Sequence, residues 1–239
     1  SVTVDADGNA WVADSGNHRV QEVGETLGFR DVGWDHPKVD DVIWMATADL
    51  DRGDDQQRFR PADPETREEL AVHLHRLAGA PEGPFPDPGV DDLPADDPAH
   101  TAAAWLVAEG GTADGTTGEP FAPEQPVTRS QLAAVLHLLR GSPEPAADGE
   151  PFADEDDVQA SEPVAITWAV EAGLVSPYDD GSFRPSGDVT RAAAATVLHR
   201  YAELDPVAPV EQVPTLVGSA GNVLGNDPTS EGDQPGFWL

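Results

Sequence analysis

Residues 182–203 read SFRPSGDVTRAAAATVLHRYAE, and this pattern occurs in altered form twice earlier in the chain. The other two copies are FRPADPETREELAVHLHRLAG, from Phe59, and FAPEQPVTRSQLAAVLHLLRG, from Phe121. In each copy a Phe-x-Pro motif precedes Thr-Arg and then a segment whose apolar residues have helical spacing. The motif arginines Arg67, Arg129 and Arg191 are evenly spaced, since the interval from the first to the second equals that from the second to the third. The chain therefore contains three tandem repeats.

The upstream half of each repeat also recurs. A Phe-x-Asp motif opens each one, at Phe29, Phe85 and Phe152, and a helical segment with one tryptophan follows. These tryptophans precede the motif arginines by nearly equal intervals, and they are Trp44, Trp105 and Trp168. We place repeat 1 at 29–79, repeat 2 at 85–141 and repeat 3 at 152–204, each predicted to be a loop, helix, turn and helix. One such unit is too small to bury its apolar face alone, so the pattern predicts a mainly α protein with three units packed about a common axis.

Composition narrows the classes of partner. The net charge of −32 supplies no basic patch, which argues against nucleic acid as a partner. The acidity fits either a high-salt habitat or a strongly solvated extracellular face. There is no cysteine for a disulfide or a thiolate metal site. No apolar run approaches the length that would suggest a membrane span.

The starts of the three motif helices carry the most information. Thr66, Thr128 and Thr190 stand at the N-cap position, where a hydroxyl accepts a free helix N–H. Glu69 and Gln131 complete capping boxes in the first two repeats, whereas repeat 3 has Ala193 there.

The arginine after each threonine meets the positive end of the helix dipole, at a cost of about 0.3–1 kcal/mol when exposed. Two explanations stay open from spacing alone. The arginine binds an anion beside the free N–H groups. Alternatively, it is a structural tie to an aspartate of a neighbouring repeat, for which the candidates are Asp31, Asp87 and Asp154.

The combined motifs resemble the S-layer homology repeat, most closely in WAVEAGLVSPYDDGSFRPSGDVTRAAAATVLHRYA (168–202). This resemblance covers residues 29–203 as three tandem units. It implies a pseudo-threefold helical assembly that holds a protein non-covalently on the secondary cell-wall polysaccharide of a bacterium, often a pyruvylated one. It also implies an extracellular, wall-associated location, with other surface-layer proteins as further partners.

Carried over residue by residue, the resemblance makes Arg67, Arg129 and Arg191 the glycan-binding residues. The supporting residues are Thr66, Thr128, Thr190, Asp31, Asp87 and Asp154. The final Glu of the family's Thr-Arg-Ala-Glu motif occurs here only as Glu69. The turn preceding the second Phe-x-Pro is longer than the pattern, so repeat 3 is closest to the family.

The two ends of the chain differ from the repeats. Residues 1–24 resemble part of one NHL repeat, with Asn17-His18-Arg19 as its signature, and predict a short β-hairpin from two strands. We expect it to be the last blade of a propeller that begins upstream. Residues 205–239 are rich in Pro, Gly and Asn and predict a disordered linker, or the start of an adhesion-type module.

An enzyme is not expected. The histidines His75, His137 and His199 occur once per repeat and are interpreted as flanking positions on apolar helices, and the tryptophans as core residues. No HExxH, GxSxG or phosphate-loop pattern occurs, and neither a metal nor a cofactor is expected. An enzyme is thus the main rival class, and the second is a structural module that contacts other surface proteins and no glycan.

Overall fold

A computed structural model describes residues 2–4, 10–14, 19–23, 29–85, 93–110, 121–146, 151–160 and 162–204. The predicted linker 205–239 and Asp87 lie outside the described residues. Within them the protein is mainly helical, as the repeats predicted. The helices are α1 (Val39–Thr47), α2 (Arg67–Leu77), α3 (Pro98–Ala108), α4 (Arg129–Leu139), α5 (Glu155–Gln159), α6 (Pro163–Glu171) and α7 (Arg191–Glu203).

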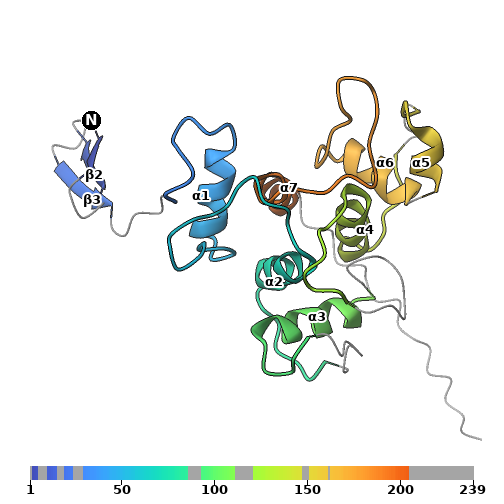
Figure 1. Cartoon of the computed structure of the whole chain (residues 1–239), viewed down its shortest axis with the longest axis horizontal. Coiled ribbons are helices and arrows are strands. Elements are labelled where there is room, and N and C mark those ends of the chain that lie inside the picture. The colour runs from blue at the N-terminus through green and yellow to red at the C-terminus, as the bar shows by residue number, and fades with distance from the viewer. Residues whose placement is uncertain are drawn as a thin grey trace, which may run out of the picture. The chain divides into compact units, whose positions relative to one another are not determined.

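The helices pair between repeats. The motif helix α2 of repeat 1 packs on α3 of repeat 2, and α4 of repeat 2 packs on α6 of repeat 3. The motif helix α7 of repeat 3 packs on α1 of repeat 1, so the last helix meets the first (Figure 1). The sequence predicted both helices of each repeat but not that each motif helix packs on the tryptophan helix of the next repeat.

A ring of three backbone hydrogen bonds joins the repeats just before their motif helices. Glu65 N–H donates to the carbonyl of Val189 at 2.8 Å, Val189 N–H to that of Val127 at 2.9 Å, and Val127 N–H to that of Glu65 at 2.8 Å. The three residues are as evenly spaced as the motif arginines, each lying two positions before one of them. This closed ring gives residues 29–204 the pseudo-threefold arrangement.

The core contains the stripes that the sequence predicted. Leu70 and Leu74 of α2 and Leu132, Val135 and Leu136 of α4 are buried. Leu77 and Leu139, which continue the same helical stripes, are only partly buried against it. Trp105 and Trp168 are buried, whereas Trp44 is half-buried.

Each Phe-x-Asp motif that the structure describes in full holds the Phe-x-Pro motif of its own repeat. In repeat 1 the rings of Phe29 and Phe59 pack with centroids 5.2 Å apart, and Asp31 accepts the N–H groups of Phe59 and Arg60 at 2.8 and 2.7 Å. Repeat 3 makes the same contacts, with Phe152 against Phe183 at 5.6 Å and with Asp154 accepting the N–H groups of Phe183 and Arg184 at 2.8 and 2.7 Å.

The middle residue of the Phe-x-Pro motif has a positive φ in all three repeats, although none is glycine. The φ angles are 57° at Arg60, 50° at Ala122 and 58° at Arg184. A left-handed conformation costs an L-residue about 1–2 kcal/mol. In repeats 1 and 3 the aspartate that accepts two adjacent backbone N–H groups holds the chain in this turn.

The N-terminal residues form a sheet of order β1-β2-β3, made of β1 (Val2–Val4), β2 (Ala10–Asp14) and β3 (Arg19–Val23). Val2 pairs with Val12 and Asp14 with Arg19, both in antiparallel register. The sheet therefore has a third strand that the two-stranded hairpin prediction lacked.

Candidate functional site

All three motif threonines cap their helices, as predicted. Thr66 accepts the N–H of Glu69 at 3.2 Å, Thr128 that of Gln131 at 3.3 Å, and Thr190 that of Ala193 at 3.3 Å. The side chains of Glu69 and Gln131 accept the N-cap N–H in return at 3.1 and 3.0 Å, which completes both predicted capping boxes. The helices therefore start where the sequence predicted.

At the first position of each motif helix, the backbone N–H already donates a hydrogen bond within the protein. Arg67 N–H donates to the carbonyl of Gln125 at 3.0 Å, Arg129 N–H to that of Gly187 at 2.9 Å, and Arg191 N–H to that of Asp63 at 2.9 Å. The idea that exposed N–H groups stand beside each arginine to receive an anion is therefore wrong. A carbonyl of a neighbouring repeat accepts each of these N–H groups.

The three motif arginines share one structural contact. Each guanidinium donates to the carbonyl of a Phe-x-Pro phenylalanine in another repeat: Arg67 to Phe121 at 3.1 Å, Arg129 to Phe183 at 2.8 Å and Arg191 to Phe59 at 2.7 Å. A cation at the first helical position is therefore explained by a tie between repeats.

Two of the three predicted partners of that tie, Asp31 and Asp154, were wrong. Asp31 and Asp154 bind backbone N–H groups within their own repeats, and the described contacts include no ion pair between either of them and a motif arginine. Asp87 lies outside the described residues.

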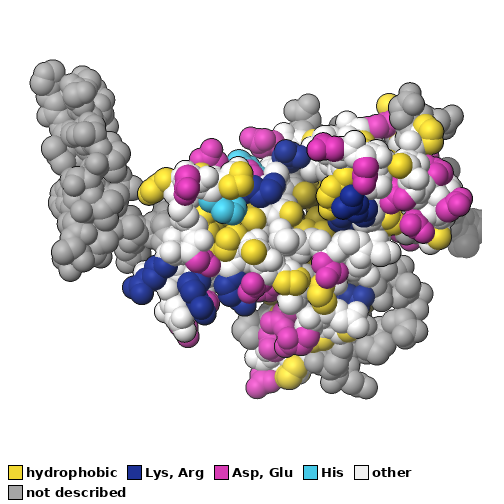
Figure 2. All heavy atoms as spheres, turned by 45° about the horizontal axis from the view of Figure 1, so that its top comes forward, with side chains coloured by type: hydrophobic (Ala, Val, Ile, Leu, Met, Phe, Trp, Pro, Cys, Tyr) yellow, Lys and Arg dark blue, Asp and Glu magenta, His cyan; other side chains and the backbone are white. Residues whose placement is uncertain are grey.

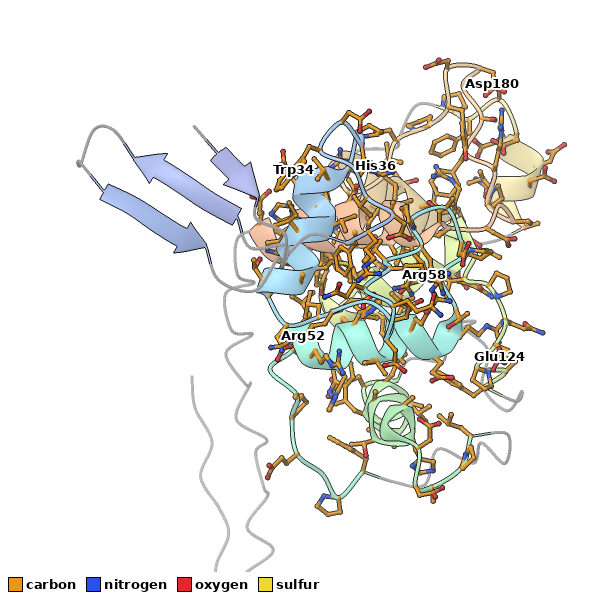
Figure 3. All side chains as sticks on the ribbon, turned by 60° about the vertical axis from the view of Figure 1, so that its left-hand side comes forward. Trp34, His36, Arg52, Arg58, Glu124 and Asp180 are labelled. Carbon is orange, nitrogen blue, oxygen red and sulfur yellow. The ribbon has the colours of Figure 1, made fainter. Side chains whose placement is uncertain are left out.

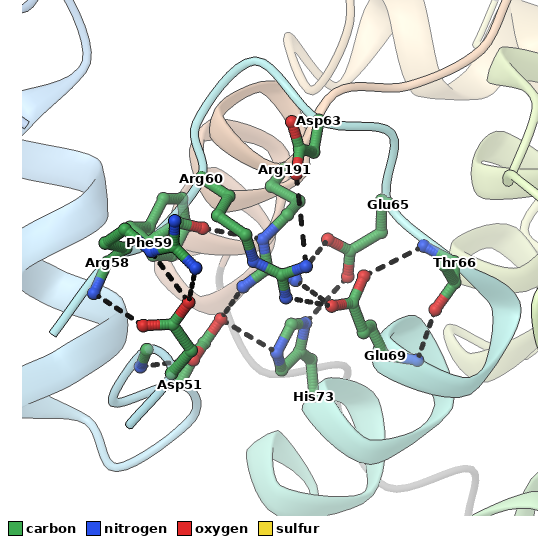
Figure 4. A network of polar contacts seen from close by, with 12 residues as sticks. Asp51, Arg58, Phe59, Arg60, Asp63, Glu65, Thr66, Glu69, His73 and Arg191 are labelled. Atoms are coloured by element: carbon green, nitrogen blue, oxygen red, sulfur yellow. Dashed lines mark hydrogen bonds and ion pairs between the residues drawn. The ribbon is translucent and has the colours of Figure 1, made fainter. Parts of the chain in front are cut away.

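The surroundings of Arg191 are strongly acidic. Its side chain is 3% exposed and forms ion pairs with Asp51 and Glu69, while Glu65 lies 3.9 Å from it (Figure 4). The Nδ1 atom of His73 lies 2.7 Å from Glu65, and its Nε2 atom lies 3.6 Å from Asp51. Two basic side chains thus stand among three carboxylates.

These neighbours change the pKa values of the buried groups. Burial by itself would lower the pKa of His73, but the charge of Glu65 and the hydrogen bonds with Asp51 and Glu65 raise it to about 9. Burial would raise the pKa of Asp51, but its hydrogen bond with His73 and the charges of His73 and Arg191 hold it well below its ordinary value. Burial opposes the charge on Arg191, yet Glu65, Asp51 and Glu69 raise its pKa.

The surroundings of Arg129 are quite different. Its guanidinium is half-buried, donates to the carbonyl of Ser176 at 2.9 Å and lies 4.9 Å from the ring centre of Tyr178. Arg184 contacts the same ring at 4.0 Å and pairs with Asp180 at 2.7 Å. Among the described residues, no carboxylate forms an ion pair with Arg129.

We call Arg129, Ser176, Tyr178 and Arg184 the Arg129 cluster. Tyr178 is 42% exposed, so the cluster is open to solvent. Figure 3 shows Asp180 at the outer end of the loop between α6 and α7 that supplies most of it. The arrangement of two guanidinium groups on one exposed aromatic ring suits a carboxylate ligand, since the arginine fork matches carboxylate geometry.

Arg67 is 7% exposed and donates to Phe121. The segment 111–120, which precedes that phenylalanine, lies outside the described residues. Within the described residues, the full contrast in surroundings is therefore the one between Arg129 and Arg191.

The histidines pack as the sequence predicted, on apolar helices, but with specific partners. His75, His137 and His199 each contact the tryptophan of the next repeat, with centroids 5.4, 5.3 and 4.5 Å apart, and those residues are Trp105, Trp168 and Trp44 in that order. Within the described residues no three His, Asp or Glu side chains are arranged to hold a metal ion. No helix of the described part is long and apolar enough to cross a membrane.

Acidic side chains are spread over the face seen in Figure 2, whereas basic ones form a few small groups. An anionic partner must therefore bind at a local site, against the field of a chain with a net charge of −32. Sequence reasoning missed Ser176, Tyr178 and Arg184, because they belong to repeat 3 and lie far from Arg129 along the chain.

Comparison with known families gives matches to two kinds of repeat. The model of the S-layer homology domain matches residues 28–71 and 151–195, and that of the NHL repeat matches residues 1–22. A search of curated proteins gives no match. S-layer homology domains anchor surface proteins to the cell wall, so the two matched regions indicate a protein associated with the cell surface.

The matched regions contain Arg67 and Arg191, and the second also contains Ser176, Tyr178 and Arg184. Repeat 2, with Arg129, lies outside both matches, and its assignment to this family stays a prediction. Its Val127 nevertheless has the same place in the hydrogen-bonded ring as Glu65 and Val189, and Thr128 caps α4 as the other motif threonines cap their helices. The expectation that residues 1–24 belong to the last blade of a propeller also stays a prediction.

Proposed function

We propose that residues 29–204 hold a bacterial surface protein on the cell wall by binding an anionic secondary wall polysaccharide, and that the Arg129 cluster is its main contact. A carboxylate such as a pyruvate ketal is the group we assign to the two arginines. In this proposal the region is a binding module and not an enzyme, and it works outside the cell.

One observation carries the proposal. Arg129 is half-buried with no ion pair among the described residues, and it lies beside an exposed tyrosine that contacts a second arginine. Burial lowers the pKa of Arg129; the charges of Tyr178 and Asp154 oppose this, and that of Arg184 adds to it. Arg184 already pairs with Asp180, so a bound carboxylate would supply the ion pair that Arg129 lacks among the described residues. A charged hydrogen bond of this kind contributes about 1.5–3 kcal/mol.

The proposal is tested by sedimentation of the protein with purified bacterial sacculi. The wild type should co-sediment, and removal of the wall polysaccharide by acid should abolish this. Arg129→Ala should weaken binding by about tenfold or more, since about 1.4 kcal/mol corresponds to a factor of ten. Arg52→Ala is the matched control, because Arg52 is exposed in a surface pair with Asp49 and its loss changes the net charge equally.

Arg129 also joins two repeats through its hydrogen bond to the carbonyl of Phe183, and Arg129→Ala removes this bond. A second variant must therefore keep Arg129 in place. Tyr178→Ala removes the exposed ring and keeps both carbonyl contacts of Arg129. It should weaken binding several-fold while circular dichroism and the thermal midpoint stay near those of the wild type. Normal binding by both folded variants would refute a role for the cluster.

The alternative is a structural module that contacts other surface proteins and no glycan. It is favoured by the shared use of all three motif arginines as ties between repeats. Co-sedimentation that survives acid stripping of the polysaccharide would support this alternative and contradict glycan binding.

A further inference from the structure

The surroundings of Arg191 differ from those of the corresponding place in the other repeats. A cavity of about 220 Å³ opens beside it, and we call this the Arg191 pocket. Its lining is mostly charged and includes Asp51, Asp54, Arg60, Glu69 and His73. Glu69 contacts both Arg191 and, at 3.2 Å, Arg60.

The charged groups around Arg191 stand at positions that are apolar in repeat 3. When the sequences are aligned at Phe59 and Phe183, Arg67 aligns with Arg191 without a gap. The second half of repeat 1 can therefore be compared with that of repeat 3 position by position. The same register pairs Asp51 with Val175, Glu65 with Val189, Glu69 with Ala193 and His73 with Val197. The three valines are buried and Ala193 is half-buried against the core.

Repeat 2 supports the comparison where the structure describes it. Alignment of Arg67 with Arg129 pairs Glu65 with Val127, Glu69 with Gln131 and His73 with Val135. No acidic residue therefore stands in repeat 2 or 3 at these three positions. Among the three repeats of this chain, only repeat 1 supplies acidic residues at these positions.

The charged residues around Arg191 lie at the junction between repeats 3 and 1, and this position gives a reason for their charge. Repeats 1 and 2, and repeats 2 and 3, are joined by the chain itself, whereas repeat 3 meets repeat 1 without a linker between them. The other side of the same junction is also polar: Asp41 of α1 contacts His199 of α7 at 2.9 Å, and Lys38 donates to Thr196 at 2.8 Å. Ion pairs and hydrogen bonds thus hold together the two repeats that no segment connects.

We propose that Asp51 and Glu69 occupy the Arg191 pocket as internal substitutes for an anionic ligand, so that this pocket binds no wall anion. Both carboxylates contact the guanidinium that a ligand carboxylate would need, and Glu65 lies close behind them. Asp51 and Glu69 are then the residues that decide which motif arginine accepts the polysaccharide. This inference rests on the proposed function and specifies which sites perform it.

The test follows the arginine side chains by nuclear magnetic resonance. Oligosaccharide fragments of the acid-released wall polysaccharide are titrated into the protein while the Nε–H signals of the arginines are recorded. In the wild type we expect the signal of Arg129 to shift and that of Arg191 to stay unchanged. Equal shifts of both signals, with one dissociation constant, would overturn the inference.

A gain of binding completes the test. The variant Asp51→Asn with Glu69→Gln keeps side-chain size and removes two negative charges, and it should bring the Arg191 signal into the titration with at least a tenfold gain in affinity at that site. A second variant installs the apolar residues of repeat 3, namely Asp51→Val, Glu65→Val, Glu69→Ala and His73→Val. If either variant folds and Arg191 still does not respond, while Arg129 does, the inference is wrong.

The outcomes separate this inference from the proposed function. Absence of any Arg129 shift in the wild type would contradict the proposed function. A response of Arg191 only in the variants would still support the internal carboxylates as its blockers. A fully silent wild type and fully silent, folded variants would overturn both.

Discussion

The strongest prediction concerns His73 and the pH dependence of stability. Its side chain is buried between Glu65 and Asp51, and these carboxylates raise its pKa from 6.5 to about 9. Replacing it by valine is a conservative test of the fold, since Val135 and Val197 occupy the equivalent positions of the other repeats.

The sign and size of the effect follow from proton binding. Between pH 6.5 and 9 the folded protein keeps a proton that the unfolded chain has lost, so the free energy of unfolding falls as the pH rises. The contribution of His73 is complete below pH 6.5 and is lost as the pH passes 9. A change from 6.5 to about 9 corresponds to about 3 kcal/mol, at about 1.36 kcal/mol for each pKa unit.

The assay is urea unfolding of the wild type and of His73→Val at intervals from pH 6 to pH 9.5. The wild type should lose about 3 kcal/mol more than the variant over this range. His137→Val is the matched control for the loss of a histidine, because His137 lies in repeat 2 and contacts the carbonyl of Pro143 and the ring of Trp168. Parallel curves for the wild type and His73→Val would refute the argument that the buried histidine carries a proton shared with Glu65 and Asp51.

Three further predictions concern the scaffold. Ala122→Gly should raise the free energy of unfolding by about 1 kcal/mol, measured by urea denaturation, because glycine adopts the φ of 50° at this position without strain. Phe59→Ala should lower it by about 3–5 kcal/mol, since that ring is 1% exposed and packs on Phe29; a loss below about 1 kcal/mol would contradict the burial described for it. Thr66→Ala should cost about 1 kcal/mol by the same measurement, whereas Thr66→Ser keeps the hydroxyl that accepts the N–H of Glu69 and should cost less.

The family resemblance and the structure agree on the scaffold and differ on the individual sites. Repeat 3 is closest to the family pattern in sequence, yet its arginine lies among three carboxylates supplied by repeat 1. The arginine of repeat 2, which lies outside the family matches, is the more open one. A motif arginine is therefore not by itself a ligand site.

Local features of this protein were readable from the sequence. The threonine caps, the capping boxes of Glu69 and Gln131 and the apolar stripe of α4 depend on residues close together along the chain, so a single stretch determines them. The even spacing of the Thr-Arg motifs likewise determined that three equivalent helices start in the same way.

The partners of the motif arginines were decided only by the tertiary structure. Arg191 contacts Phe59 and Asp51, which lie 132 and 140 residues away, and Arg129 contacts Ser176, 47 residues away. Spacing within a repeat carries no information on such contacts, because α7 returns to α1 and each motif helix packs on the next repeat. One signal was present in the sequence nonetheless: Asp51, Glu65 and His73 are charged or titratable where repeat 3 has valine, and a charge at an otherwise apolar position marks a junction that repetition alone does not explain.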